Sequence, residues 1–278
     1  MQLSSKDVSV IISVYKDTES LAVVLASLAN QTVDGFEIII SEDGESEEMR
    51  SFLAKHMSAG LIHVTQADNG WRKNRVLNKS VQQAKGNYLI FLDGDCVPNS
   101  NLLKAHTFLA KDDHYLLGRR VFLGESFSNR FKNSPTSFKV FEKNYLRNIW
   151  ALHRDGVRHF EDGIVLPLNP TMHKISSIVR GTPNIVGCHF SCFKEDLLAI
   201  NGFDEDYPGP GAGEDEDIVW RFSGIGLKPL TCRNFANVFH LNHAKRTSTS
   251  MSAQNKALMF DKMKERLYRC SNGIVKEG

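Results

Sequence analysis

The first 120 residues alternate between apolar segments of strand length and segments with helical periodicity. Residues 8–14 form a nearly continuous apolar run, and Leu21, Val24, Leu25 and Leu28 follow at helical spacing. A strand buried on both faces is apolar throughout, whereas a helix packed on a sheet is apolar along one face only. The pattern therefore predicts a strand followed by a helix. Further strands are expected at 36–41, 61–65 and 88–92, with helices at 46–55 and 76–84.

This alternation predicts an α/β fold, with a mostly parallel central sheet and helices on both faces. Parallel strands need long crossover connections, which helices supply. At 278 residues, with 41% hydrophobic and 24% charged residues, the chain can form one large domain or two coupled subdomains. Ligands of such sheets bind beyond the carboxyl ends of the strands, so the site is expected there.

Charge and cysteine content narrow the class of protein. The net charge of +2 provides no general attraction for nucleic acid, so we expect no nucleic-acid partner and only a local phosphate site. The five cysteines are odd in number and form no CxxC pair, which favours reduced thiols and a cytoplasmic location. No stretch approaches the roughly 20 apolar residues that span a bilayer, so a soluble or peripheral protein is expected.

Each of the four expected strands ends in a polar run. These runs occupy residues 15–17, 41–44, 66–73 and 93–95. A single run of this kind would be explained as a turn or a helix cap. Because the carboxyl ends of parallel strands meet at one edge of a sheet, the four runs together predict a polar site at that edge.

The triplet Asp93-Gly94-Asp95 directly follows the fourth apolar segment. Two carboxylates separated by one residue can hold Mg²⁺ or Mn²⁺ against a substrate's diphosphate. Asp-Gly is also common in turns, so the triplet by itself is a weak signal. Its position after a buried strand strengthens the interpretation as a metal site.

A second acidic cluster comprises Glu214, Asp215, Glu216 and Asp217, and follows the Pro- and Gly-rich segment 208–213. A helix start favours negative charge, which would explain the cluster without any functional role. The segment before it resembles a loop that closes over substrate, and adjacent carboxylates can raise one another's pKa. Both interpretations remain open from the residues themselves.

Two further features have alternative explanations. His240 and His243 follow an apolar run at i and i+3, and near a metal site such a pair could supply ligands, although a lone histidine is more often structural.

The segment 127–154 is basic and aromatic, so it either lies on an anionic membrane or grips a lipid diphosphate, or it packs as a helix over the sheet. Its basic residues are Arg130, Lys132, Lys139, Lys143, Arg147 and Arg154, and its aromatic residues are Phe127, Phe131, Phe138, Phe141, Tyr145 and Trp150.

The sequence resembles the family 2 glycosyltransferases. The matching segments are VSVIISVYKDTESLAVVLASLANQT, FEIIISEDGE and NKSVQQAKGNYLIFLDGDC. A later block, NGFDEDYPGPGAGEDEDIVWRFSGIG, is similar to the acceptor-side segment of galactosyltransferase-like and chondroitin-polymerase-like enzymes. The resemblance implies a Rossmann-like glycosyltransferase A-type fold and covers residues 7–121 and about 184–246.

The chain is accordingly divided into four expected segments. They are a nucleotide-sugar-binding subdomain (1–121), a variable basic and aromatic insert (122–183), an acceptor-binding and catalytic subdomain (184–246), and a C-terminal helix and tail (247–278). Within the last segment, residues 253–268 show helical spacing of apolar side chains.

The resemblance also implies which residues bind the nucleotide sugar. Asp43 is expected at the uracil or ribose, Asp93 at the ribose or sugar, and Asp95 at the metal. Many members have Arg-Asn where this chain has Leu77-Asn78, so the usual cationic contact must come from Arg72, Lys73 or Arg75. Arg72 is preferred because it follows Asn69-Gly70-Trp71 at the expected helix start. The full set is Tyr15, Asp43, Arg72, Asn78, Asp93, Gly94 and Asp95.

On the acceptor side, the resemblance implies that Asp215 is the catalytic base and that Glu214 binds the acceptor. Asp217 is assigned to the acceptor side as well, with bracing of the loop as its more natural role. His243 is expected to complete the metal sphere with Asp95, because Lys245 and Arg246 follow it and could hold the diphosphate. His240 is the reserve ligand.

The predicted function is metal-dependent transfer of a hexose or N-acetylhexosamine from a UDP-sugar to a hydroxyl of a saccharide or lipid-linked saccharide. Mn²⁺ or Mg²⁺ is the expected cofactor, inversion the expected outcome, and surface polysaccharide biosynthesis the expected role. One alternative is a sugar-nucleotide nucleotidyltransferase, although residues 14–17 are not the Gly-rich phosphate loop that such enzymes usually need. The other is a noncatalytic nucleotide-sugar-binding protein, which would have little use for a second acidic cluster.

Overall fold

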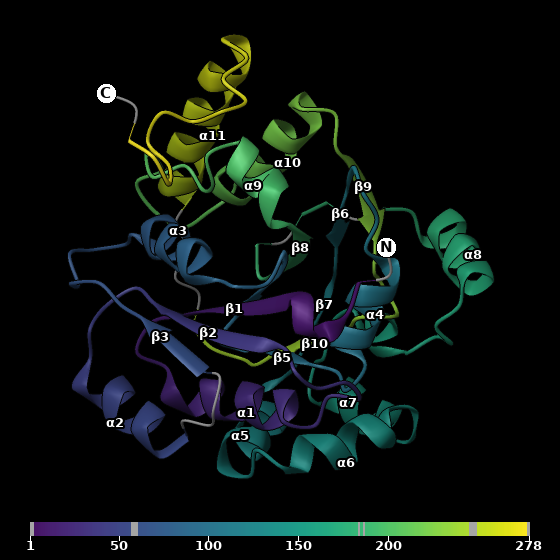
Figure 1. Ribbon diagram of the computed structural model, residues 1–278. Helices are drawn as coiled ribbons and strands as arrows, with labels where there is room; N and C mark the ends of the chain where they lie inside the picture. The colour runs from purple at the N-terminus through teal and green to yellow at the C-terminus, as the bar shows by residue number, and fades with distance from the viewer. Residues whose placement is uncertain (1–2, 57–60, 183, 186, 245–248, 277–278) are drawn as a thin grey trace.

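The computed structural model describes residues 3–56, 61–182, 184–185, 187–244 and 249–276. A seven-stranded sheet with the order β3-β2-β1-β4-β8-β6-β9 forms the centre of the molecule (Figure 1). Its strands are β1 (Val8–Val14), β2 (Glu37–Glu42), β3 (Leu61–Val64), β4 (Tyr88–Asp93), β6 (His114–Leu117), β8 (His189–Phe193) and β9 (Lys228–Thr231).

The first four of these strands are parallel, as the alternating pattern predicts. β1 pairs with β2 and β4, and β2 pairs with β3, all in parallel register. The crossovers contain α1 (Thr18–Leu28), α2 (Glu47–His56) and α3 (Lys73–Gln83). α3 begins three residues before the expected residue 76. Its first turn is polar, so apolar periodicity does not reveal where the helix starts.

β8 enters the sheet from far along the chain and runs antiparallel to both of its neighbours, β4 and β6. It places residues of the segment 184–246 in the middle of a sheet otherwise built mainly by the first 121 residues. The α/β fold with a mostly parallel sheet is confirmed, and this antiparallel strand is an addition that the repeat of strand and helix does not encode.

Helices cover both faces of the sheet, with a separate apolar core on each (Figure 1). Along β1, Val10 and Ile12 belong to one core and Ile11 to the other, which explains why these consecutive residues are all apolar. On one face lie α1, α2, α4 (Leu102–Leu109), α5 (Glu125–Asn133) and α6 (Ser137–Lys143). On the other lie α3, α9 (Lys194–Ala199) and α10 (Glu214–Gly224), with α11 (Thr249–Lys264) packed on α10.

A second, three-stranded sheet continues from the end of β4. Its order is β5-β10-β7, formed by β5 (Cys96–Pro98), β7 (Arg120–Phe122) and β10 (Val238–His240). β10 pairs antiparallel with β5 and parallel with β7. Because only Gly94 and Asp95 separate β4 from β5, the small sheet places His240 beside the Asp93-Gly94-Asp95 turn.

The aromatic residues of the segment 127–154 mostly pack inward, as the helix-packing alternative predicts. The ring of Phe138 contacts Phe239 of β10, with 5.3 Å between the ring centroids. Trp150 is the exception, because 78% of its surface is exposed on α7 (Ile149–Arg154). The buried aromatic residues are Phe127, Phe131, Phe138, Phe141 and Tyr145.

The remaining helices complete the insert and the C-terminal region. The insert also holds η2 (Tyr145–Asn148), η3 (Phe160–Gly163) and α8 (Pro170–Arg180). The C-terminal helix α11 starts four residues before the expected 253 and ends at Lys264. All five cysteines are free and buried. Within the described residues, we found no helix with the length and hydrophobicity needed to cross a bilayer.

Candidate active site

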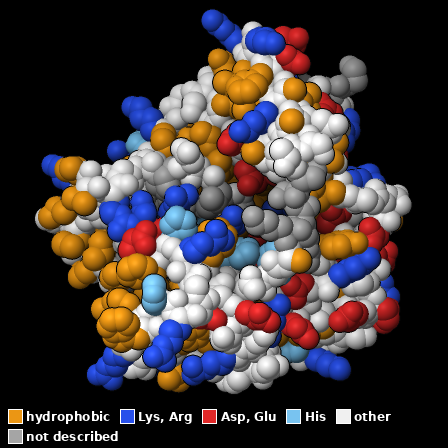
Figure 2. Space-filling model, turned by 180° about the vertical axis from the view of Figure 1, so that it is seen from behind, with side chains coloured by type: hydrophobic (Ala, Val, Ile, Leu, Met, Phe, Trp, Pro, Cys, Tyr) orange, Lys and Arg blue, Asp and Glu red, His pale blue; other side chains and the backbone are white. Residues whose placement is uncertain are grey.

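Four charged residues from distant parts of the chain meet at the carboxyl end of β4. Lys73 opens α3, Asp93 ends β4, and Glu214 and Asp215 open α10, and all four line one narrow pocket. The Nζ of Lys73 lies 2.8 Å from the Oδ1 of Asp93. The backbone N–H of Gly187 donates to the Oδ2 of Asp215 at 3.1 Å. Acidic, basic and histidine side chains gather near the middle of the face shown in Figure 2.

Burial and mutual charge set the protonation of this group. Burial by itself lowers the pKa of Lys73, but the carboxylates of Asp93, Glu214 and Asp215 outweigh it and raise the pKa, so Lys73 stays charged. Burial and the neighbouring charge of Asp215 raise the pKa of Glu214 well above its usual range. Glu214 is 8% exposed whereas Asp215 is half-buried, so Asp215 is the more accessible carboxylate.

On the other side of the same turn, Asp95 faces two histidines. The Nε2 of His243 lies 3.1 Å from Oδ2 of Asp95, and the Nε2 of His240 lies 3.6 Å from Oδ1. Burial raises the pKa of Asp95, but the hydrogen bond from His243 and the charge of both histidines dominate and lower it to about 2. One oxygen and two nitrogens within 4.8 Å of one another fit a divalent cation.

Two other groups of potential ligands occur among the described residues. His106, His189 and Cys232 are fully buried, and the Nε2 atoms of the two histidines lie 3.0 Å apart, as in a hydrogen bond between neutral rings. In the second group, His159, Glu161 and Asp162, both carboxylates already pair with Arg180 and Arg233. The Asp95 cluster therefore remains the candidate metal centre.

The polar ends of β1 and β2 hold the residues that are expected to contact the nucleotide. Asp43 is 6% exposed; its Oδ2 accepts from the backbone N–H of Arg72 at 2.7 Å and its Oδ1 from Gln66 at 2.8 Å. The Tyr15 hydroxyl donates to Asp68 at 3.2 Å. These contacts hold the loop after β3 against the ends of β1 and β2, while the contacts of Asp43 and Tyr15 with a nucleotide stay predictions.

The sequence favours Arg72 as the cation of the site, but the residue that lines the pocket is Lys73. The guanidinium of Arg72 instead donates to the carbonyl of Ala67. Lys73 lies one position further along, and the first turn of α3 directs it towards Asp93. Lys245 and Arg246, the basic residues expected to follow the metal ligand, lie outside the described residues.

Asn78 does not face the candidate site. Its Nδ2 donates to the carbonyl of Phe203 and its Oδ1 accepts from the N–H of Phe203, both at 2.8 Å, and the side chain is 3% exposed. The amide of Asn78 joins α3 to the loop after α9. Its expected contact with the nucleotide sugar stays a prediction.

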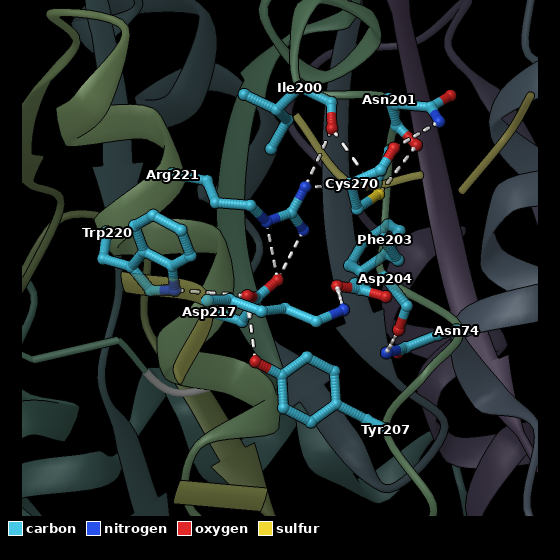
Figure 3. A network of polar contacts seen from close by, with 12 residues as sticks. Asn74, Ile200, Asn201, Phe203, Asp204, Tyr207, Asp217, Trp220, Arg221 and Cys270 are labelled. Carbon is cyan, nitrogen blue, oxygen red and sulfur yellow. Dashed lines mark hydrogen bonds and ion pairs between the residues drawn. The ribbon is translucent and has the colours of Figure 1, made fainter. Parts of the chain in front are cut away.

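Asp217 is not among the residues that line the pocket, and its assignment to acceptor binding stays a prediction. Figure 3 shows its carboxylate between Arg221, Tyr207 and Trp220. Its Oδ2 accepts from the Nε of Arg221 at 2.7 Å, and its Oδ1 accepts from the Tyr207 hydroxyl at 2.9 Å. Tyr207 directly precedes the Pro- and Gly-rich segment 208–213. The contact with Tyr207 therefore agrees with the bracing role expected for Asp217.

The sequence does not predict three residues near the candidate metal centre. Arg120 and Phe122 lie on β7, and Arg158 forms a backbone bridge to Phe122. They belong to no recognised motif, and their proximity to His240 depends on strand pairing between segments more than 100 residues apart. No local signal in the sequence could have identified them.

Comparisons with known proteins agree with this arrangement. The model of glycosyl transferase family 2 matches residues 9–161, more than half of the chain, and that of the N-terminal domain of galactosyltransferase matches residues 174–244. The second match contains the acidic cluster and both histidines.

Similar proteins include two chondroitin synthases and one solved structure. The Escherichia coli chondroitin synthase is 33% identical over 129 residues, 45% of this chain and 19% of its own length. That of Pasteurella multocida (strain Pm70) is 25% identical over 236 residues, 78% of this chain and 23% of its own. The chain thus spans about a fifth of these relatives.

The structure of GalNAc-T7 with UDP, GalNAc and Mn²⁺ superposes with a TM-score of 0.61 at 16% identity, covering 91% of this chain and 47% of that one. At this identity the likeness establishes the fold, and the expected glycosyltransferase A-type architecture is confirmed. Together with the match over residues 9–161, these observations confirm the resemblance: the chain belongs to glycosyl transferase family 2.

Proposed function

We propose that the chain is a glycosyltransferase that moves a sugar from a UDP-sugar to a hydroxyl of a saccharide or lipid-linked saccharide during polysaccharide biosynthesis. The observation that carries the proposal is the two-sided Asp93-Gly94-Asp95 turn. Asp93 faces Lys73 and Asp215, whereas Asp95 faces the two histidines. A single turn thus joins a carboxylate pocket to a candidate metal centre, as a metal-assisted transfer requires.

The donor would lie across the ends of β1, β2 and β4. Asp43 and Tyr15 would contact the uracil or ribose, and the Lys73 ammonium would offset the negative charge of Asp93 and of the diphosphate. A divalent ion held by Asp95, His243 and His240 would stabilise negative charge on the diphosphate. Imidazole nitrogen in this set favours Mn²⁺ over Mg²⁺, which prefers oxygen ligands and water.

Asp215 would act as the general base. It would accept the proton of an acceptor hydroxyl while the hydroxyl oxygen bonds to the anomeric carbon and the bond from that carbon to the UDP oxygen breaks. UDP would leave as the anion, and attack from the opposite face would invert the configuration. Glu214 lies beside Asp215 with a raised pKa, so it would present an acidic proton that can donate to an acceptor oxygen.

The test measures release of UDP from a panel of UDP-sugars, with and without saccharide acceptors, in the parent protein and in Asp215→Asn. We expect the substitution to lower the rate of transfer by roughly 10²- to 10⁴-fold, with little change in UDP affinity. Glu216→Gln is the matched control, because Glu216 occupies the same helical turn but is exposed. Near-normal turnover in Asp215→Asn would contradict the assignment, and a panel with no donor consumed would contradict the proposed activity.

We also propose peripheral contact between residues 127–154 and an anionic membrane. Supporting it are the exposed apolar side chains of Leu146, Ile149 and Trp150, which lie beside the exposed basic residues Arg147 and Arg154. Aromatic and basic side chains in this combination are suited to the interface of an anionic bilayer.

A further inference from the structure

The Phe122 ring lies between two arginines. The guanidinium carbon of Arg120 is 4.7 Å from the ring centroid, and that of Arg158 is 4.5 Å from it. Guanidinium groups at this distance are attracted by the ring quadrupole, which positions two positive charges that would otherwise repel each other. Backbone hydrogen bonds in both directions between Phe122 and Arg158, each 3.0 Å long, fix the pair.

This group lies directly beside the candidate metal centre. Phe122 and His240 are register partners of β7 and β10, with ring centroids 5.3 Å apart. Side chains of paired residues point to the same face of a sheet, and so do those of residues i and i+2, which includes Arg120. A row of side chains therefore leads from His240 across Phe122 to Arg158.

Among the described residues, no carboxylate neutralises the charge of Arg158. No carboxylate among them lies within ion-pair distance of its guanidinium, although Arg180 and Arg233 pair with Glu161 and Asp162 nearby in sequence. Arg158 is exposed, and the buried Nε of Arg120 has no hydrogen-bond partner. Arg120 also donates from Nη1 to the Sγ of Cys188 at 3.1 Å, so the exposed Arg158 is the cation that is open to a ligand. A cation beside the candidate metal centre, with no carboxylate partner among the described residues, favours an anionic ligand.

We infer that Arg158, with Phe122 and Arg120, forms a subsite for an acidic group, a carboxylate or a phosphate, on the acceptor saccharide. This inference rests on the proposed function and names the class of its acceptor. The subsite belongs to the acceptor because the donor already has Lys73 and the metal ligands for its diphosphate. Tyr15 and Asp43 also lie on the large sheet, whereas Arg158 lies beyond the edge strand of the small one.

The test compares aryl glycosides of four sugars, each as a neutral compound and as its 6-phosphate. The aryl glucuronide and galacturonide are compared as well. The sugars are glucose, galactose, N-acetylglucosamine and N-acetylgalactosamine. Binding to the protein saturated with UDP and Mn²⁺ is measured by ligand-observed NMR, and transfer is measured in parallel. We expect at least one acidic compound to bind about tenfold more tightly than its neutral partner, as one charge-assisted hydrogen-bonded contact provides. The phosphate and uronide arms identify which acid is preferred.

Arg158→Gln should abolish this preference, and Phe122→Leu should weaken it. Arg154→Gln is the control, because Arg154 is an exposed arginine of the same insert that does not contact Phe122. Arg154→Gln should also leave hydrolysis of UDP-sugar without acceptor unchanged. The inference would be overturned if the acidic and neutral compounds bound equally in every pair, or if none of the compounds bound. A preference for the acidic compound that survives Arg158→Gln would overturn it as well. Transfer to neutral acceptors would still leave the proposed function intact, whereas absence of donor turnover would refute it separately.

Discussion

The Nζ of Lys73 lies 2.8 Å from the Oδ1 of Asp93 and is enclosed by Glu214 and Asp215 as well. One positive charge therefore stands among three acidic side chains at the place where the proposed donor carries its own negative charge. Without Lys73, the carboxylates would repel the diphosphate.

Lys73→Met keeps an unbranched stem but removes the charge. We expect UDP affinity, measured by titration calorimetry in the presence of Mn²⁺, to fall by about tenfold or more. Arg72→Met should have little effect, because the Arg72 guanidinium donates to the Ala67 carbonyl. Equal losses in the two variants would contradict the placement of Lys73 as the donor's cation.

The candidate metal centre is tested by binding as well as by activity. Asp95→Asn should weaken Mn²⁺ binding, followed by electron paramagnetic resonance, and chelation should abolish transfer until Mn²⁺ is restored. His243→Gln should weaken binding more than His240→Gln, because His243 lies closer to the Asp95 carboxylate. His153→Gln, at an exposed position of α7, is the control. Full activity in excess chelator would refute a role for the metal.

Glu214 should make stability depend on pH. Its pKa is raised in the folded protein by burial and by Asp215, so the folded state holds this proton more tightly than the unfolded chain does. The contribution of Glu214 to the free energy of unfolding is therefore most favourable below the usual glutamate pKa, and it is lost as pH rises. Glu214→Gln should melt at the parental temperature near pH 4 but about 2–4 °C higher at pH 8, on the order of 1 kcal/mol. Glu216→Gln should show no such divergence, and a Glu214→Gln difference independent of pH would contradict the mechanism.

Asp217 should affect stability more than chemistry. Asp217→Asn leaves the fully buried Arg221 guanidinium without its anion, which typically costs about 3–5 kcal/mol. A fall in melting temperature is expected, with UDP affinity retained at low temperature. Adding Arg221→Met should recover part of the loss, because no buried charge then remains unpaired. Parental stability with impaired acceptor binding would instead return Asp217 to the acceptor site.

Trp150 should report membrane contact. Its fluorescence is expected to shift to shorter wavelength with anionic vesicles, and Trp150→Phe should remove that shift while Trp71 and Trp220 remain. Charge reversal at Lys139, Lys143 and Arg147 should weaken vesicle sedimentation, more so at low salt, because each basic residue contributes about 1 kcal/mol near such a surface. Negligible sedimentation of the parent protein with anionic vesicles would refute the membrane proposal.

The sequence by itself determined the parallel half of the fold and the position of the acidic turn. Strand and helix periodicities are local, and the nearly continuous apolar run of β1 reflects burial on both faces. Since parallel strands present their carboxyl ends at one edge, the polar runs after β1, β2 and β4 were correctly expected to meet there. Asp93 and Asp95 follow from these local rules.

Only the tertiary structure decided which polar side chains face the site. Asn78 and Asp217 match the residue types of a binding site, yet pairing with the Phe203 backbone and with Arg221 buries them elsewhere. The register of β7 against β10 places Phe122 beside His240, although 118 positions separate the two residues. Such contacts depend on which segments pair across the fold, and because that pairing follows from packing of the whole chain, no local pattern of residues contains it.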